Sequence, residues 1–318
     1  MLTENKTLRK VTPSGHREGL IAVEPDNWRK EALISATERA GGTVCSPDEA
    51  TALIWSAPEN PDVLPDFVKD QHDWVQLPFA GIEPFVELLD DQRVWTCGKG
   101  VYASAVAEHA LAMILSLKRG LVDYSISKSW GKPFGSNLLG SRVLILGGGG
   151  IAEELIPMLQ PFGCSITVIR KSSLPLSGCG QVLSLDELNS VLPETDVLVI
   201  ALALTGETEG IINKERLDLL PSQAIVINVA RGRHIVTSDL VNALKIKSIA
   251  GAGLDVTEPE PLPAGHALWE FSNCLITPHT GNTPEMGIQL LSQRIEENVA
   301  RYIAGEHLLG CIDIGAGY

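Results

Sequence analysis

The glycine-rich stretch VLILGGGGIA, residues 143–152, restricts the fold of this chain more than any other segment. Four apolar residues lead directly into a cluster of glycines, and the residues that follow, IAEELIPMLQ, repeat apolar side chains at helical spacing. We therefore predict a strand, a tight turn and a helix, as at the entry to a dinucleotide-binding βαβ unit. A glycine-rich turn with a purely structural role is the alternative interpretation.

The individual residues of this turn fit the dinucleotide interpretation. Gly147, Gly149 and Ala152 occupy the three positions of the pattern G-x-G-x-x-G/A. These positions permit a tight turn, a close approach of the backbone to a pyrophosphate, and close packing of helix on strand. A helix N-terminus favours an anion, because its first N–H groups are unpaired and its dipole is positive there. We therefore expect Gly147, Gly149, Gly150 and Ile151 to bind a pyrophosphate.

Alternating strand-like and helix-like segments predict an α/β protein. At 318 residues the chain fits two domains. The strand-like segments are GLIAV, TALIWS, WVQL, RVWTCG, SRVLIL, SITVI, TDVLVIAL, AIVINVA, AGAGLDV and CLITPH. Helical patterns separate many of them, and strands joined by helical crossovers are parallel. The longest helical patterns are SAVAEHALAMILSLKRGLVDYSISKSW, which we expect to be buried, and EMGIQLLSQRIEENVARYIAGE near the end of the chain.

These segments divide between two domains of unequal size. Residues 103–284 are predicted to form a doubly wound, parallel-sheet (Rossmann) cofactor domain, in which a dinucleotide binds where the strand order reverses. Residues 1–102 and 285–318 are predicted to form a smaller α/β substrate domain. This domain is discontinuous, because the last helical pattern has no place in a completed cofactor-domain sheet.

Composition excludes several classes of partner. A net charge of −14 argues against a nucleic-acid surface, and the sequence lacks an apolar run long enough for a membrane span. The first residues lack the apolar core of a secretory signal, so we expect a cytoplasmic location. The six cysteines form no C-x-x-C pair, so we expect no metal site and six reduced, mostly buried thiols.

The end of the second cofactor-domain strand suggests which dinucleotide binds. An acid about 20 residues after the first glycine would bind the ribose 2′-hydroxyl of NAD. This chain instead has Arg170, Lys171, Ser172 and Ser173 there. Because cations and hydroxyls suit a 2′-phosphate, we favour NADP(H) and keep NAD(H) as the alternative. Solvated side chains at a loop tip would be the structural explanation.

Three further residues follow apolar strands and could carry the chemistry of carbonyl reduction. His279, in LITPHTGN, can act as an acid or a base near neutrality. Arg231, in INVARGR, can grip a carboxylate with two parallel hydrogen bonds. Glu260, in LDVTEPEPL, would orient the imidazole and favour its protonated form. A structural histidine and an exposed loop acid are the alternatives, and neighbouring Glu258 is a competing candidate.

Several motifs occur in an order that resembles the D-isomer-specific 2-hydroxyacid dehydrogenase family over nearly the full length of the chain. The motifs are VAEHALAMIL, Trp130 followed by LLGSRVLILGGGGIA, ALTGETEGIINKERLDLLPSQAIVINVARG, GAGLDVTEPEPLP and LITPHTGN. The resemblance implies that Arg231 binds substrate, Glu260 is the partner carboxylate and His279 is the acid/base. It favours Glu260 over Glu258, because the family's acid precedes a Pro-Leu pair.

The same resemblance implies further roles and an architecture. It implies that backbone N–H groups around Ala80 and Gly81 hold the substrate carboxylate. It also assigns four residues to the cofactor side, namely Thr205, Val229, Ala230 and Asp255. The smaller domain is expected to be flavodoxin-like and the protein a homodimer. Gly150 stands where the family often has Arg, and Ala203 where it often has Pro or His.

We therefore expect an NADPH-preferring reductase of a small 2-oxo acid such as glyoxylate or hydroxypyruvate. One alternative is an NAD-dependent D-2-hydroxyacid or phosphoglycerate-type dehydrogenase. A second alternative, from a different class, is a non-catalytic dinucleotide sensor similar to the family's corepressors.

Overall fold

The computed structural model describes residues 18–315, and the described chain divides into two compact units. The first unit comprises the chain up to Val101 together with the chain from Pro284 onward. The second comprises Tyr102–Thr283. The polar leader at residues 1–17 and the last three residues, which were predicted to belong to the smaller domain, lie outside the described residues.

The first unit is built on a five-stranded parallel sheet with the order β2-β1-β3-β4-β5. Its strands are β1 (Leu20–Glu24), β2 (Thr43–Val44), β3 (Ala52–Trp55), β4 (Trp74–Gln76) and β5 (Val94–Thr96). Its helices are α1 (Lys30–Arg39), α2 (Leu64–Phe67) and α9 (Pro284–Ala304), with short 3-10 turns η1 (Pro61–Val63) and η2 (Glu83–Leu88). This strand order is the flavodoxin-like one, so the predicted fold of the smaller domain is confirmed.

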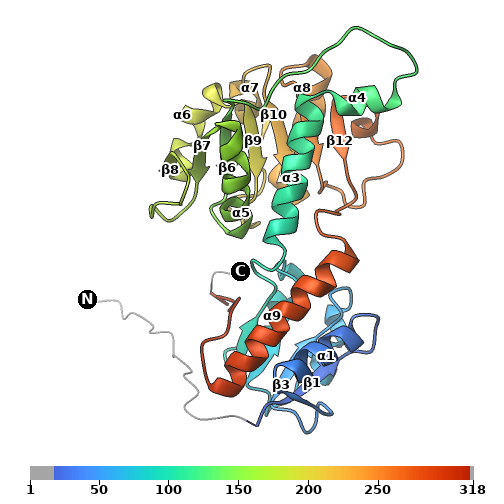
Figure 1. Cartoon of the computed structure of the whole chain (residues 1–318), viewed down its shortest axis with the longest axis vertical. Helices are drawn as coiled ribbons and strands as arrows, with labels where there is room; N and C mark the ends of the chain where they lie inside the picture. Colours follow the sequence, from blue (N-terminus) through green and yellow to red (C-terminus); the bar gives the residue numbers. More distant parts are fainter. Residues whose placement is uncertain (1–17, 316–318) are drawn as a thin grey trace. The chain divides into compact units, whose positions relative to one another are not determined.

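Both faces of this sheet are covered, as the continuous apolar strands require. On one face α1 and α9 pack together, and Leu33 of α1 shares a core with Leu291 and Ile295 of α9. Figure 1 shows α9 lying across α1 beside the sheet. On the other face Leu64 of α2 and Phe85 of η2 pack on strand residues. The helix predicted near the end of the chain thus completes the first unit, although about 190 residues separate it from β5.

The second unit is built on a seven-stranded parallel sheet with the order β12-β11-β10-β9-β6-β7-β8. Its strands are β6 (Arg142–Leu146), β7 (Ser165–Ile169), β8 (Gln181–Leu183), β9 (Val197–Ile200), β10 (Ile225–Asn228), β11 (Gly251–Leu254) and β12 (Cys274–Ile276). The chain starts in the middle at β6, runs outward to β8, and returns to β9 on the other side. The strand order therefore reverses between β6 and β9, which confirms the doubly wound fold.

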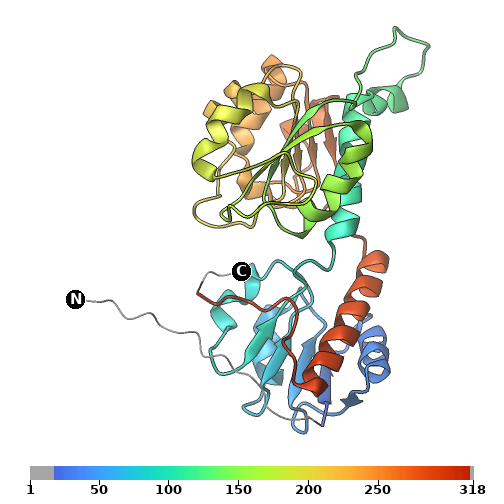
Figure 2. The ribbon, with the colours of Figure 1, turned by 60° about the vertical axis from the view of Figure 1, so that its left-hand side comes forward.

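Helices cover both faces of this second sheet (Figure 2). The helices are α3 (Ala103–Lys118), α4 (Leu121–Ile126), α5 (Gly150–Leu159), α6 (Leu188–Val191), α7 (Lys214–Leu219) and α8 (Thr237–Ile246). The 3-10 turns are η3 (Gln160–Phe162), η4 (Leu185–Glu187), η5 (Leu192–Glu194), η6 (Gly232–His234) and η7 (Ala267–Glu270). Helices α3 and α5 pack on one face around Val143 and Ile145, and α6, α7 and α8 pack on the other around Leu144 and Leu146. Successive residues of β6 thus pack into different cores, as expected for a strand, in which side chains alternate between the two faces of the sheet.

Three details differ from the sequence expectations. The long helical pattern after residue 103 is two helices, because Gly120 adopts φ +63° and ends α3 before α4 begins. The edge strands β2 and β8 were not predicted; β2 is two residues long and β8 three. All six cysteines are free, but only Cys97 and Cys274 are fully buried. Within residues 18–315, no helix combines the length and apolar character needed to cross a membrane.

Candidate active site

The glycine turn lies at the point where the strand order of the second sheet reverses. Gly147 follows β6 with φ +105°, a conformation that side chains other than glycine rarely adopt. A Cβ atom on Gly147 would lie 2.3 Å from the carbonyl oxygen of Ala201, which follows β9. Glycine is therefore required here by both the backbone angle and the close approach of two strand ends.

Gly149 and the start of α5 provide the space and polarity that a dinucleotide phosphate needs. Gly149 is the N-cap of α5, and an added Cβ atom would meet no heavy atom within 4 Å. Gly150 and half-buried Ile151 form the first turn of this 10-residue helix. The first N–H groups of a helix and its dipole attract an anion. An open approach to a helix N-terminus at the reversal point thus fits a pyrophosphate.

Arg170 lies directly over this turn. Its Nη1 donates to the carbonyl oxygen of Gly148 at 3.2 Å, and its Nε donates to the carbonyl oxygen of Ser172 at 3.0 Å. Lys171 is exposed and forms an ion pair with Glu207 at 3.0 Å. Arg170 therefore lies beside the turn that is expected to bind the pyrophosphate. The ammonium group of Lys171 is instead paired with a surface carboxylate.

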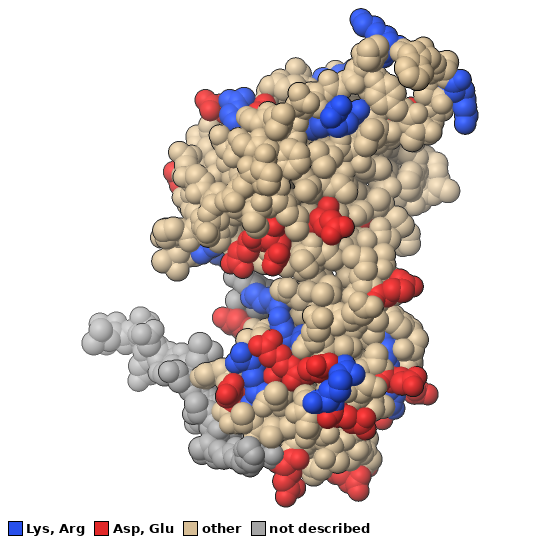
Figure 3. Space-filling model, viewed as in Figure 1, with Lys and Arg blue, Asp and Glu red and all other residues tan. Residues whose placement is uncertain are grey.

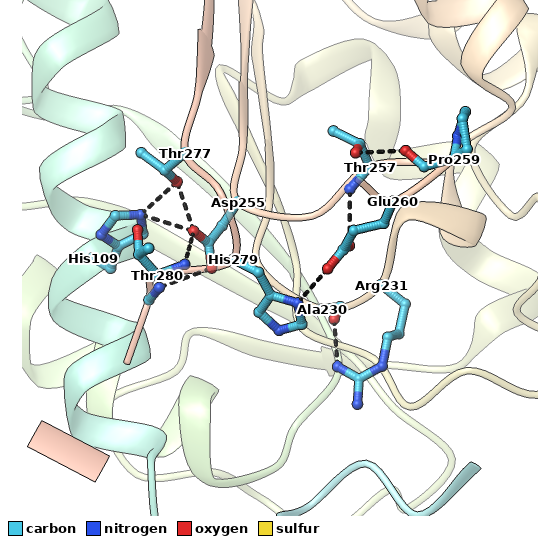
Figure 4. A network of polar contacts seen from close by, with 11 residues as sticks. His109, Ala230, Arg231, Asp255, Thr257, Pro259, Glu260, Thr277, His279 and Thr280 are labelled. Carbon is cyan, nitrogen blue, oxygen red and sulfur yellow. Dashed lines mark hydrogen bonds and ion pairs between the residues drawn. The ribbon is translucent and has the colours of Figure 1, made fainter. Parts of the chain in front are cut away.

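Glu260 and His279 form the central pair of the site (Figure 4). The distance between His279 Nδ1 and Glu260 Oε1 is 2.6 Å, and both side chains remain about half exposed. Because a carboxylate only accepts hydrogen bonds, His279 Nδ1 carries the proton in this contact. The backbone N–H of Thr257 donates to the other oxygen of Glu260 at 3.4 Å. The imidazole is therefore oriented, and Nε2 is the ring atom that can exchange a proton with a substrate.

The loop that carries His279 is held by Asp255, which is only 3% exposed. His279 itself adopts φ +53°, and its backbone N–H donates to the carbonyl oxygen of Asp255 at 2.8 Å. The Asp255 carboxylate accepts hydrogen bonds from Thr277 Oγ1 at 2.6 Å, Thr280 N at 2.8 Å and Gly281 N at 2.9 Å. Burial raises the pKa of Asp255, but hydrogen bonds from His109, Thr277 and the two backbone amides outweigh it and lower the pKa to about 2.

Arg231 follows β10, and buried polar groups hold its backbone. The side chain of Asn228 donates to the carbonyl oxygen of Arg231 at 2.8 Å and accepts from Ala230 N at 3.1 Å. The Nδ1 atom of His234, which is fully buried, lies 3.0 Å from the same Arg231 carbonyl oxygen. The Arg231 guanidinium donates to the carbonyl oxygen of Ala230 at 2.7 Å.

Close packing at Gly232 joins the loop of Arg231 to the loop of Glu260. A Cβ atom on Gly232 would lie 2.0 Å from the carbonyl group of Thr257. Figure 4 shows Arg231 on the same side of the network as the Glu260–His279 pair. The structure thus brings together a guanidinium, a carboxylate and an imidazole from the carboxyl ends of β10, β11 and β12.

The remaining predicted site residues lie in two places. Val229 and Ala230 are buried after β10, and Thr205 lies in the segment after β9, where its N–H donates to Thr208 Oγ1 at 2.8 Å. Ala80 and Gly81 lie in the first unit, in the loop between β4 and η2, with Ala80 exposed. Across residues 18–315 the structure contains no group of three or more His, Cys, Asp or Glu side chains arranged for a metal ion.

Four residues with supporting contacts were not identified from the sequence: His109, Asn228, His234 and Thr277. A signal existed for two of them. His109 interrupts an apolar helical pattern, and Asn228 is a polar residue at the end of an apolar strand. Their partners are distant in sequence, so the pattern alone could not show what they bind.

Comparisons with known proteins show which family this chain resembles. Residues 87–281 match the family described as D-isomer specific 2-hydroxyacid dehydrogenase, NAD binding domain. An uncharacterized protein of the proB 3′ region of Corynebacterium melassecola is 39% identical over 83% of this chain and 88% of its own length. Glyoxylate/hydroxypyruvate reductase A of Salmonella paratyphi B is 34% identical over 66% of this chain and 68% of its own length.

A solved structure shows the same overall architecture. The D-isomer specific 2-hydroxyacid dehydrogenase of Xanthobacter autotrophicus Py2, in complex with NADPH and MES, superposes with a TM-score of 0.81. It shares 27% sequence identity, and the match covers 95% of this chain and all of the other. The family match covers more than half of the chain, and the Corynebacterium relative matches most of its length. The chain therefore belongs to the D-isomer specific 2-hydroxyacid dehydrogenase family.

Proposed function

We propose that this protein reduces a small 2-oxo acid of the glyoxylate or hydroxypyruvate type to the corresponding D-2-hydroxy acid, with NADPH as the preferred cofactor. The observation that carries this proposal is the contact between Glu260 and His279 beside Arg231 in a dinucleotide-binding fold. Family membership and the relative named as a glyoxylate/hydroxypyruvate reductase support the same reaction.

In the proposed reaction each of the three side chains has a distinct task. Arg231 binds the substrate carboxylate, since a guanidinium matches two carboxylate oxygens. His279 Nε2 donates a proton to the carbonyl oxygen, and Glu260 stabilises the imidazolium before the proton leaves. Backbone N–H groups around Ala80 and Gly81 are also proposed to hold the substrate carboxylate. Bound NADPH supplies the hydride that reduces the carbonyl carbon.

We propose that the residues of the glycine turn, Gly147, Gly149, Gly150 and Ile151, hold the pyrophosphate. Thr205, Val229, Ala230 and Asp255 are proposed to line the cofactor side. Arg170 supports the preference for NADPH, because it lies against Gly148 and is positioned next to that turn. Together with Lys171 and Ser172 it would bind the 2′-phosphate through charge-assisted hydrogen bonds.

We propose further that Tyr102–Thr283 is the cofactor domain and that the remaining residues form the substrate domain. The match of residues 87–281 to an NAD binding domain supports this assignment. The free cysteines favour a reducing compartment, and we propose the cytoplasm.

A homodimer is proposed from an exposed apolar segment of the second unit. Residues 127–139 project beyond α4 in Figure 1. Trp130 is fully exposed, Phe134 is 52% exposed and Leu139 is 65% exposed. Figure 3 shows basic side chains on this projection, where the sequence has Lys128 and Lys132. A second copy of the chain would cover the exposed apolar side chains of this segment. The variant Trp130→Ser with Phe134→Ser should be monomeric by light scattering; a monomeric wild type would refute the dimer.

The function is tested with a matrix of glyoxylate, hydroxypyruvate, pyruvate and 3-phosphohydroxypyruvate against NADH and NADPH, followed by nicotinamide absorbance. We expect turnover of the first two substrates, with a higher kcat/KM for NADPH. Arg170→Asp should lower kcat/KM with NADPH much more than with NADH. A preference for NADH that Arg170→Asp leaves unchanged would show that the preferred cofactor is NAD(H) and not NADP(H). Cofactor binding without turnover on any 2-oxo acid would support a dinucleotide sensor instead.

A further inference from the structure

His109 of α3 contacts the network that holds the loop of His279. Its Nε2 atom lies 3.0 Å from Thr277 Oγ1 and 3.4 Å from Asp255 Oδ1. The His109 side chain is 22% exposed and lies on a helix otherwise lined with buried Ala107, Ala110 and Met113. Figure 4 shows the ring directed from the helix toward Thr277 and Asp255. None of the reaction steps above uses this histidine.

The directions of these hydrogen bonds determine which ring nitrogen of His109 carries a proton. Thr277 Oγ1 donates its only hydrogen to Asp255 Oδ1 at 2.6 Å. The same oxygen can therefore only accept from His109, so Nε2 of His109 is the donor. In the second, longer contact Nε2 is again the donor, and Asp255 Oδ1 is the acceptor. His109 thus donates one N–H group to the Thr277 hydroxyl and the Asp255 carboxylate, which support the loop of His279.

This N–H group acts at the base of the loop that carries the proton donor. Asp255 binds the backbone N–H groups of Thr280 and Gly281, the two residues after His279. His279 itself stands at φ +53°, a conformation that costs free energy unless the surroundings impose it. Anything that loosens Asp255 or Thr277 will therefore widen the range of positions that the His279 imidazole samples.

We infer that His109 is a positioning residue for the reaction, which acts through Thr277 and Asp255 to keep the His279 imidazole in its reactive place. This inference rests on the proposed function for its kinetic consequences. It assigns His109 no contact with substrate or cofactor. It predicts that loss of the N–H group lowers kcat by a much larger factor than it weakens cofactor binding.

The kinetic test compares two substitutions at the same position. His109→Leu removes the donor and keeps an apolar side chain, and we expect kcat for glyoxylate with NADPH to fall about 10- to 100-fold, because small misplacements of a reacting group cost this much. His109→Gln keeps an N–H donor and should recover most of the loss. The dissociation constant of NADPH, measured by fluorescence, should rise by a much smaller factor than kcat falls. His307→Leu, at an exposed histidine of the first unit, is the matched control and should equal wild type.

A double-mutant cycle shows whether His109 acts through its proposed partner. Thr277→Val removes the hydroxyl and should lower kcat to a similar extent. Because both residues belong to one chain of hydrogen bonds, the double variant should lose little more than either single variant. If the fold-losses in kcat of the two single variants multiplied in the double variant, the inference would be overturned. Equal kcat values for His109→Leu and wild type would also overturn it. So would a His109→Gln variant as impaired as His109→Leu. If His109→Leu does not fold, Thr277→Val and His109→Gln carry the test.

Hydrogen exchange gives a measurement that does not depend on turnover. In His109→Leu the amides of Thr280 and Gly281 should exchange about 10-fold faster than in wild type, while peptides from the first unit are unchanged. Unchanged protection of these amides would overturn the inference even if the variant were slow. A wild type that is inactive on every 2-oxo acid would refute the proposed function, and the exchange experiment would still decide the role of His109.

Discussion

The imidazole of His279 donates a hydrogen bond from Nδ1 to the carboxylate of Glu260 at 2.6 Å, although the two residues are 19 positions apart and follow different strands. This contact fixes the orientation of the ring and leaves Nε2 for proton exchange. It also places a negative charge beside the form of the ring that donates a proton.

Replacing His279 by Ala should lower kcat for glyoxylate reduction about 10²- to 10⁴-fold, because a positioned general acid contributes a factor of this size. The dissociation constant of NADPH should remain within about threefold of the wild-type value. Steady-state kinetics and fluorescence titration measure the two quantities. Wild-type turnover in this variant would show that another group donates the proton.

Glu260→Gln should lower kcat by about 10- to 100-fold. A neutral amide can still accept from Nδ1, but it no longer supplies the charge, and a charged hydrogen bond is worth about 1.5–3 kcal/mol. The neighbouring variant Glu258→Gln is the control and should be close to wild type. If the two substitutions had equal effects, Glu260 would not be the specific partner of His279.

Two glycines of the dinucleotide turn should respond differently to alanine. Gly149→Ala has room for its Cβ atom and should fold, yet bind NADPH at least about tenfold more weakly, since the methyl group occupies the space expected for a phosphate. Gly147→Ala should destabilise the protein by about 3 kcal/mol or more, because its Cβ atom would clash with Ala201 at a positive φ. Urea unfolding and cofactor titration separate the two effects. Unchanged cofactor affinity in folded Gly149→Ala would argue against the phosphate site.

Asp255 should contribute to stability at neutral pH and lose that contribution in acid. Its pKa falls from 3.8 to about 2 on folding, so its contribution is complete above pH 3.8 and disappears as the pH falls toward 2. The size of this shift corresponds to about 2 kcal/mol. Asp255→Asn should therefore be less stable than wild type at pH 7. Its free energy of unfolding should also decrease less than that of wild type between pH 4 and pH 2. Urea unfolding at several pH values measures this difference, with exposed Glu154→Gln as the control. An identical pH dependence in Asp255→Asn and wild type would contradict the assignment.

His72 should make the stability of the protein fall below neutral pH. Burial is the main cause that lowers its pKa below the usual 6.5, and Arg93 and Lys69 add to this, although hydrogen bonding to Pro47 opposes them. Its Nδ1 accepts a hydrogen bond from Lys69 N. Protonation of Nδ1 would therefore place its N–H group against the backbone N–H of Lys69. The unfolded chain gains a proton at pH 6.5 that the folded chain does not bind. The free energy of unfolding should therefore decline as the pH falls below 6.5, by at most about 1.4 kcal/mol per unit from this group. In His72→Gln the slope between pH 7 and pH 5 should be smaller; an unchanged slope would exclude this role.

Much of the fold follows from local patterns in the sequence. Apolar strands alternating with helical patterns predicted a parallel α/β protein, since parallel strands need crossovers. The glycines at 147 and 149 marked the entry to the dinucleotide unit, and Arg231 and His279 were candidates because each directly follows an apolar strand. Glu260 was favoured over Glu258 only through the resemblance to the family. The edge strands β2 and β8 were missed, because such short segments are defined by the ladder to their neighbours.

The sequence by itself determined which chemical groups this protein possesses and at which strand ends they stand. Only the tertiary structure decided how they are paired. That Asp255 binds the loop of His279, that His109 supports Asp255 from α3, and that Asn228 holds the backbone of Arg231 all depend on contacts between separate segments. The physical reason is that a hydrogen bond depends on distances of a few tenths of an ångström, which are set by the packing of whole strands and helices and not by the residue types alone.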